Sequence, residues 1–88
     1  MNKEEKTIHK LRLLADKVSD YMQELTNDSV TILCDATMLN IEYRAYLPDE
    51  IGEVCQKCFQ YMTTDDNPEG TDDELIEELS GVLGEFFE

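Results

Sequence analysis

Cationic and conformationally special residues are scarce in this chain of 88 residues, which has seven lysines and arginines, four glycines, two prolines and no tryptophan. It also lacks the run of about 18 or more apolar residues that spans a bilayer, and its N-terminus lacks the apolar segment of a signal peptide. Its three cysteines, an odd number, provide no regular disulfide framework. These absences predict a cytoplasmic protein with reduced thiols and no membrane association.

Catalytic and nucleotide-binding signatures are absent as well. The chain contains no G-x-S-x-G, no phosphate loop, no H-E-x-x-H and no dinucleotide fingerprint. A chain of this length buries roughly 60 to 65% of its unfolded surface, which is enough for one domain over residues 1–88 but hardly for a water-excluding active site. We therefore expect a non-enzymatic protein without catalytic residues or a cofactor.

Acidic residues are abundant and unevenly distributed. Residues 1–44 carry six Lys/Arg against eight Asp/Glu, a net −2, whereas residues 45–88 carry one cation, Lys57, against thirteen carboxylates, a net −12. A surface this negative repels nucleic acids and anionic membranes and attracts basic partners, so direct binding of DNA, RNA or lipid is not expected. The total of −14 also opposes self-association and favours a monomer over a dimer.

The chain begins with an amphipathic pattern. Apolar residues recur at spacings of three and four and predict a helix from Asn2 to about Thr26. Asn2 and Glu5 have the spacing of a capping box. The apolar positions of this helix are Ile8, Leu11, Ala15, Val18, Met22 and Leu25.

Two stretches of alternating polarity follow, "VTILCD" at 30–35 and "LNIEYRAYL" at 39–47. A period of two is typical of half-buried strands, so we expect a hairpin that turns at Ala36 and Thr37. The turn contains neither Gly nor Asn, which leaves its type undetermined. The side chains that this pairing gathers on one face are Val30, Ile32, Cys34, Leu39, Ile41 and Tyr43.

Two more helices are predicted in the second half. Pro48 followed by two carboxylates is a typical helix start, and Thr71 and Glu74 have the spacing of a capping box. The element order α-β-β-α-α predicts a small α+β domain in which the helices pack on a two-stranded antiparallel hairpin. The predicted core positions are Ile51, Val54, Cys55, Cys58, Phe59 and Met62 in the first of these helices and Leu75, Ile76, Leu79, Val82, Leu83 and Phe86 in the second.

The stretch "TTDDNPEGTDDE" between these helices is a candidate calcium loop. Asp65-x-Asn67-x-Glu69-Gly70 follows the first six positions of an EF-hand. The second half does not fit, because the twelfth position, normally a bidentate Glu, is Ile76. We therefore interpret the stretch as a loop ahead of a helix and predict no metal site.

Cys55 and Cys58, together with Cys34 and His9, are candidate zinc ligands. The Cys-x-x-Cys pair, however, falls in the middle of a predicted helix and on its apolar side. Redox pairs usually open a helix and zinc pairs usually occupy a tight turn. We therefore predict that all three cysteines are small buried side chains, reduced and free of metal.

The last predicted helix combines an apolar stripe with an acidic one, because its glutamates fall within an arc of about 100° opposite the core positions. Like charges three or four residues apart destabilise a helix by roughly 0.2 to 0.5 kcal/mol per pair. Asp49, Glu50 and Glu53 extend this acidic ridge if the two helices pack suitably. Gly81 and Gly84 lie on the same polar side. The predicted partner-binding residues are Asp65, Asp66, Glu69, Asp72, Asp73, Glu74, Glu77, Glu78 and Glu85.

In size, charge and order of elements the chain resembles the small acidic inhibitors that phages and mobile elements encode, among them DNA mimics and some anti-CRISPR proteins. The resemblance implies a stoichiometric blocker of a nuclease or another basic nucleic-acid-binding protein, and it carries over no site residue by motif. Carboxylates three or four residues apart rise about 4.5 to 6 Å along a helix, near the separation of phosphates along a nucleic-acid strand.

Two other interpretations stay open. The acidic ridge can be a solvated face that keeps a small domain soluble, in which case the two glycines only let the last turns fray. Alternatively, the protein can be a small adaptor or a dimeric regulator. It would then bind through the hairpin edge or the first helix, where Lys6, Lys10 and Lys17 form a basic stripe near Leu13.

Overall fold

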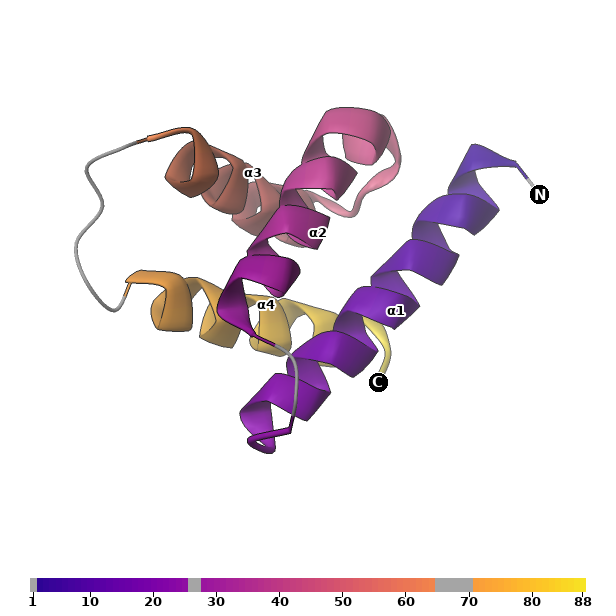
Figure 1. The fold of residues 1–88 in the computed structure, drawn as a ribbon. Coiled ribbons are helices and arrows are strands. Elements are labelled where there is room, and N and C mark those ends of the chain that lie inside the picture. The colour runs from indigo at the N-terminus through magenta and orange to yellow at the C-terminus, as the bar shows by residue number, and fades with distance from the viewer. Residues whose placement is uncertain (1, 26–27, 65–70) are drawn as a thin grey trace.

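The computed structural model describes residues 2–25, 28–64 and 71–88. In chain order these residues form α1 (Lys3–Met22), α2 (Ser29–Tyr43), the short 3-10 helix η1 (Arg44–Tyr46), α3 (Asp49–Thr63) and α4 (Thr71–Phe86), as Figure 1 shows. No strand occurs within these described ranges. The predicted α+β class and its hairpin are therefore wrong, and the domain is a small all-α bundle.

The stretch predicted as a hairpin is α2 followed by η1. Asp28 is the N-cap of α2, because its Oδ1 accepts hydrogen bonds from the Thr31 N–H at 2.8 Å and from the Thr31 hydroxyl at 2.9 Å. The helix continues through the expected turn, where the Thr37 hydroxyl donates to the Leu33 carbonyl at 2.7 Å. The buried residues of α2 follow a helical spacing and are Ile32, Leu33, Ala36 and Leu39.

The strand prediction failed because both periods fit a stretch that is apolar on most of its positions. Of the six side chains assigned to one face of the hairpin, Ile32 and Leu39 are buried, whereas Val30, Cys34 and Ile41 are exposed. The alternation was therefore not the pattern that the core uses. The middle of the stretch has no Gly or Asn to favour a turn, and the helix continues through it, with Ile32, Leu33, Ala36 and Leu39 on its buried side.

Helices α2 and α4 lie at the centre of the bundle. They contact each other, and each also contacts α1 and α3. Figure 1 shows α4 passing behind α1 and α2, with α3 on the other side of α2 from α1. The core between them consists of Leu11, Leu14, Val18, Ile32, Leu33, Ala36, Leu39, Leu47, Ile51, Val54, Cys55, Cys58, Leu75, Ile76, Leu79 and Leu83.

The first helix is confirmed, with a corrected buried side. Its predicted cap is present, since Asn2 Oδ1 accepts a hydrogen bond from the Glu5 N–H at 2.8 Å. Its buried residues are Thr7, Leu11, Leu14 and Val18, whereas the predicted core positions Ile8, Met22 and Leu25 are about half exposed. The helix ends at Met22 because Glu24 has a positive φ of 61°, and the Leu25 N–H then closes onto the Asp20 carbonyl at 2.8 Å.

The two helices predicted in the second half are also confirmed. Pro48 is the N-cap residue of α3, and α4 begins at Thr71. The predicted core positions are largely buried, but Phe59 and Val82 are only partly so, and Met62 and Phe86 are exposed. The capping contact predicted for Thr71, and the candidate calcium loop at 65–70, lie outside the described residues.

Proline at position 37 distinguishes the observed helix from the predicted hairpin. In a hairpin Thr37 would lie in the turn, where proline is often tolerated, but in the middle of α2 proline removes a backbone hydrogen bond and clashes with the preceding turn. We expect Thr37→Pro to lower the free energy of unfolding by about 3 kcal/mol or more, measured by urea denaturation followed by circular dichroism. Thr37→Ala is the control and should cost far less. Near-native stability of the proline variant would contradict the helix.

Candidate acidic binding surface

The structure describes six of the nine predicted partner-binding residues. Asp65, Asp66 and Glu69 lie outside the described residues. Asp72 is half-buried at the start of α4. The five remaining carboxylates are all exposed along α4 and are Asp73, Glu74, Glu77, Glu78 and Glu85.

Packing of α4 determines the direction of these side chains. The helix buries Leu75, Ile76, Leu79 and Leu83 against the rest of the bundle. With about 100° between successive residues, Glu74 and Glu77 fall on the opposite, solvent side, and Glu78 and Glu85 fall toward α3. The predicted glutamate ridge is therefore a strip along the outer side of α4, with no carboxylate between Glu78 and Glu85.

Helix α3 adds carboxylates next to this strip. Asp49 and Glu50, in the first turn of α3, line a shallow groove of about 260 Å³ together with Glu85 of α4. Apolar side chains, among them Val82 and Phe86, also line the groove. The extension of the ridge onto α3, left conditional on packing by the sequence, is present for Asp49 and Glu50 but not shown by this groove for Glu53. We call the combined surface the acidic face, and it consists of Asp49, Glu50, Glu74, Glu77, Glu78 and Glu85.

One lysine lies within the acidic face. The Lys57 ammonium of α3 is 2.9 Å from Glu78 Oε2 of α4. This hydrogen bond, and then the charges of Glu78 and Glu53, hold the pKa of Lys57 above its ordinary value. Both side chains are about half exposed, so the pair adds little to stability. It does leave one carboxylate of the face partly neutralised.

Asp73 is bound at the edge of α4 that faces α1. Its carboxylate accepts a hydrogen bond from the Tyr21 hydroxyl, which joins the last turn of α1 to the first turn of α4. This bond, with burial and the nearby charges of Asp73 and Asp72, raises the pKa of Tyr21 to about 12. The structure thus separates Asp73 from the acidic face and places it at the contact between α1 and α4, where the charge of the half-buried Asp72 also acts on Tyr21.

Two glycines interrupt α4 on the same side as the glutamates. Gly81 and Gly84 are exposed, and a Cβ added at either position would meet no atom within 4 Å. Neither glycine is therefore required for close packing inside the described part of the chain. Each costs a helix interior about 0.5 to 1 kcal/mol relative to alanine.

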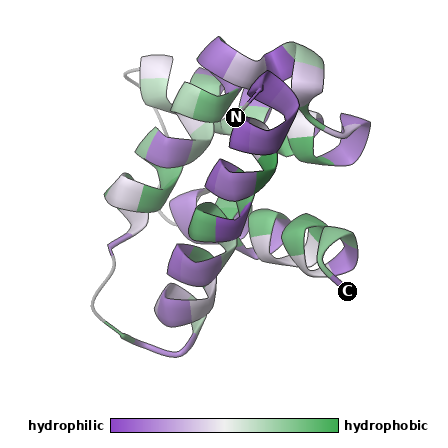
Figure 2. Ribbon diagram, turned by 90° about the vertical axis from the view of Figure 1, so that its right-hand side faces the viewer, coloured by the Kyte–Doolittle hydropathy of each residue, from purple (hydrophilic) through white to green (hydrophobic). Residues whose placement is uncertain are grey.

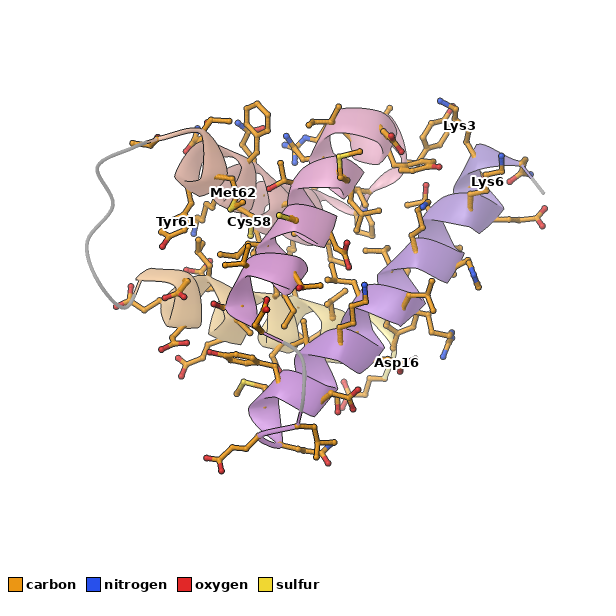
Figure 3. All side chains as sticks on the ribbon, viewed as in Figure 1. Lys3, Lys6, Asp16, Cys58, Tyr61 and Met62 are labelled. Atoms are coloured by element: carbon orange, nitrogen blue, oxygen red, sulfur yellow. The ribbon has the colours of Figure 1, made fainter. Side chains whose placement is uncertain are left out.

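The cysteines do not form a site. Cys55 and Cys58 are fully buried in α3, and Figure 3 shows Cys58 between α3 and α2. Burial raises the pKa of Cys55 to about 11 and that of Cys58 to about 12. Cys34, predicted to be buried with them, is exposed on α2 because that segment is a helix. Among the described residues no three His, Cys, Asp or Glu side chains are grouped so as to hold a metal ion.

Two contacts of this surface had no signal in the sequence. Lys57 and Glu78 are 21 residues apart, and Tyr21 and Asp73 are 52 apart. The residue pattern of a single helix cannot predict contacts between residues of two different helices. The acid-rich first turn of α3, which does join the acidic face, was visible in the sequence as Asp49 and Glu50.

Comparison of the chain with protein-family models, with curated proteins and with solved structures gives no match. Across the described ranges no helix combines the length and the apolar character that crossing a bilayer requires.

Thiol reactivity should separate the three cysteines. We expect Cys34 to react with a thiol reagent such as dithionitrobenzoate faster than the other two cysteines at neutral pH, because no other part of the same chain buries it. Cys55 and Cys58 should react only as the protein opens, because they are buried and protonated. Complete labelling in denaturant gives the total count, and Cys34→Ser should abolish the fast phase. A fast phase of more than one thiol would contradict this arrangement.

Stability should fall in mild alkali. The folded-state pKa values of Cys55 and Cys58 are raised above the ordinary 9.0, so the unfolded chain releases these protons first. The contribution of the two thiols to the free energy of unfolding is complete below pH 9.0 and is lost as the pH rises toward 11. Each thiol reduces the free energy of unfolding by up to about 1.4 kcal/mol per pH unit in that window.

Urea denaturation at several pH values between neutrality and this window measures the alkaline slope. Cys34→Ser should leave it unchanged. Cys55→Ala should reduce it and lower stability at neutral pH, and the remaining slope comes from Cys58 and, above pH 10.0, from Tyr21. A stability that does not change with pH in this window would contradict the burial of both thiols.

Proposed function

We propose that this protein is a non-enzymatic binding protein whose acidic face engages a basic nucleic-acid-binding protein and blocks it as a nucleic-acid mimic does. The partner's lysines and arginines, which normally contact phosphates, would contact the carboxylates of α3 and α4. The cytoplasmic location expected from the sequence is part of the same proposal.

The observation that carries this proposal is the unfavourable composition of α4 on its exposed side. Glu74, Glu77 and Glu78 repel one another at about 0.2 to 0.5 kcal/mol per adjacent pair. Gly81 and Gly84 weaken the same helix, although a Cβ at either position would meet no packed neighbour within 4 Å. A surface needed only for solubility would favour alanine, lysine or glutamine there. Close approach of a basic partner accounts for both features at once.

The geometry of the acidic face also fits a site on the partner that normally binds the phosphates of a nucleic acid. Glu77 and Glu78 lie about 4.5 and 6 Å along α4 from Glu74, and Glu85 lies about 10 Å beyond Glu78, where Asp49 and Glu50 add a second group across the groove. The negative surface is therefore two helices wide. Attraction of this kind accelerates encounter and weakens with salt, as in protein–DNA binding.

A second candidate function is that of an adaptor that binds through the side formed by α1 and α2. The hairpin edge proposed for that role does not exist, because the segment is helical. Of the basic stripe of the first helix, Lys6 and Lys10 are exposed and Lys17 is half-buried in an ion pair with Asp35 of α2. Leu13 beside them is 48% exposed. The two functions differ in which side of the molecule the partner covers.

A fourfold substitution of the acidic face, Glu74→Gln, Glu77→Gln, Glu78→Gln and Glu85→Gln, tests the proposal. Glutamine keeps helix propensity and removes repulsion, so stability should hold or rise. The immobilised parent should capture basic proteins from cell lysate that are released by salt and by double-stranded DNA or RNA. The glutamine variant should lose them, with affinity reduced at least tenfold for each purified partner.

The matched control neutralises four carboxylates on another side of the molecule: Glu4→Gln, Glu5→Gln, Asp16→Asn and Glu24→Gln, all exposed on or just after α1. It has the same net charge as the glutamine variant, so equal loss of binding in both would indicate a general charge effect and contradict a defined face. Gly81→Ala with Gly84→Ala should raise the free energy of unfolding by about 1 to 2 kcal/mol and weaken partner binding. Raised stability with unchanged binding would exclude the glycines from the interface.

A further inference from the structure

Helix α2 has a second apolar stripe that the other described helices leave uncovered. Val30 is 59% exposed, Met38 48% and Ile41 58%, with Cys34 exposed and Thr37 half-buried between them. At about 100° per residue these five side chains fall within an arc of about 100°, and no charged residue lies in that arc. In Figure 2 the ribbon of α2, at the left edge of the molecule, is green or white over most of its length.

A helix that is apolar on nearly all sides is normally buried on nearly all sides. The inner half of α2 satisfies this rule through its contacts with α1, α3 and α4. The outer half does not, because its largest side chains, Met38 and Ile41, are about half exposed or more. Contiguous exposed apolar surface of this kind marks an interaction site.

We propose that a second copy of this chain covers the stripe, with the two α2 helices packed antiparallel about a two-fold axis. The order of residues along the stripe is what points to a second copy. When the midpoint between Thr37 and Met38 lies on the axis, Thr37 faces the second copy's Met38, and Cys34 faces the second copy's Ile41. Each facing pair combines a small and a large side chain, which is the pattern that interdigitates well. The same axis brings Val30 to the small Ala45 in the middle of η1.

The charges beside the stripe fit the same axis. Lys17 and Asp35 form an ion pair at one end of a groove between α1 and α2, and Lys10 and Glu42 line the other end. An antiparallel partner brings the Lys17–Asp35 end of one copy to the Lys10–Glu42 end of the other. Each carboxylate then has a lysine of the other copy within reach, so the flanks are complementary to themselves.

Net charge is a weaker obstacle to this dimer than the value of −14 suggests. The acidic face lies on α3 and the outer side of α4, whereas α1 turns Lys3 and Lys6 outward on the other side of the bundle (Figure 3). The thinnest dimension of the chain is 19 Å, so the two acidic faces lie further apart than the Debye length of about 8 Å at physiological salt. The monomer expected from total charge took no account of this separation.

Sedimentation equilibrium under reducing conditions tests the dimer. At micromolar concentrations and physiological salt we expect a mass of twice the chain's 10.2 kDa. Ile41→Glu, at an exposed position, should leave the helical circular dichroism unchanged and raise the dissociation constant by roughly 30-fold or more. Ile8→Glu is the matched control, since Ile8 is 47% exposed on α1 away from the stripe, and it should leave the dimer intact. A parent protein that stays monomeric would overturn the proposal and leave the stripe to a different protein.

Disulfide trapping tests the antiparallel register. Native Cys34 and the second copy's Cys34 are offset by seven residues in this register, about 10 Å along the helix, which is too far for a disulfide. Ile41→Cys places a thiol opposite the native Cys34, so mild oxidation should produce a covalent dimer in high yield. Cys34→Ser combined with Ile41→Cys should not cross-link. Efficient cross-linking of the parent through Cys34 would indicate a parallel pair and overturn the proposed arrangement.

Discussion

Burial of the inner side of α2 is the constraint on which the rest of the bundle depends. The other three described helices all contact α2, and Ile32, Leu33 and Leu39 are almost completely buried among them. Burial of each such side chain stabilises the fold by roughly 1.5 to 3 kcal/mol. This is several times the roughly 0.2 to 0.5 kcal/mol by which one pair of adjacent like charges destabilises a helix. The core therefore tolerates in α4 a strip of glutamates and two glycines that an isolated helix would not.

The same packing separates the charges of the molecule. Helix α4 buries its apolar side against α2 and α1, so its glutamates point outward, and the start of α3 brings Asp49 and Glu50 beside Glu85. The lysines of α1 lie on the side that borders α2, where Lys3 and Lys10 each approach the Tyr43 ring to within 6 Å of its centre. A protein of −14 thus has one strongly acidic side and one side that is apolar with a mixed-charge rim.

This separation gives the two proposals distinct surfaces. A basic partner on the acidic face would not compete with a second copy on the outer side of α2, because the two surfaces lie on opposite sides of the bundle. A dimer would also present two acidic faces that point away from each other. Binding of a partner with two or more basic sites would then be strengthened by avidity without new contacts at either face.

Much of the local structure could be predicted from the sequence. The capped start of α1, the proline start of α3, the start of α4 and the glutamate strip of α4 all depend on residues within a few positions of one another, and such patterns are visible in the chain itself. The buried Cys55 and Cys58 followed from their places on the apolar side of one helix. The excess of carboxylates in the second half of the chain follows directly from counting its charged residues.

Only the tertiary structure decided the conformation of residues 30–47 and the neighbours of the acidic residues. The segment 30–47 has enough apolar residues to fit both the period of two of a strand and the period of 3.6 of a helix. It forms a helix whose inward side is the one that α1, α3 and α4 can cover. That choice exposed Cys34 and Ile41, which a hairpin would have buried. The contacts of Lys57 with Glu78 and of Tyr21 with Asp73 join residues far apart in the chain. Sequence determines which side of each helix is apolar, but which helices meet depends on how all those sides are buried together.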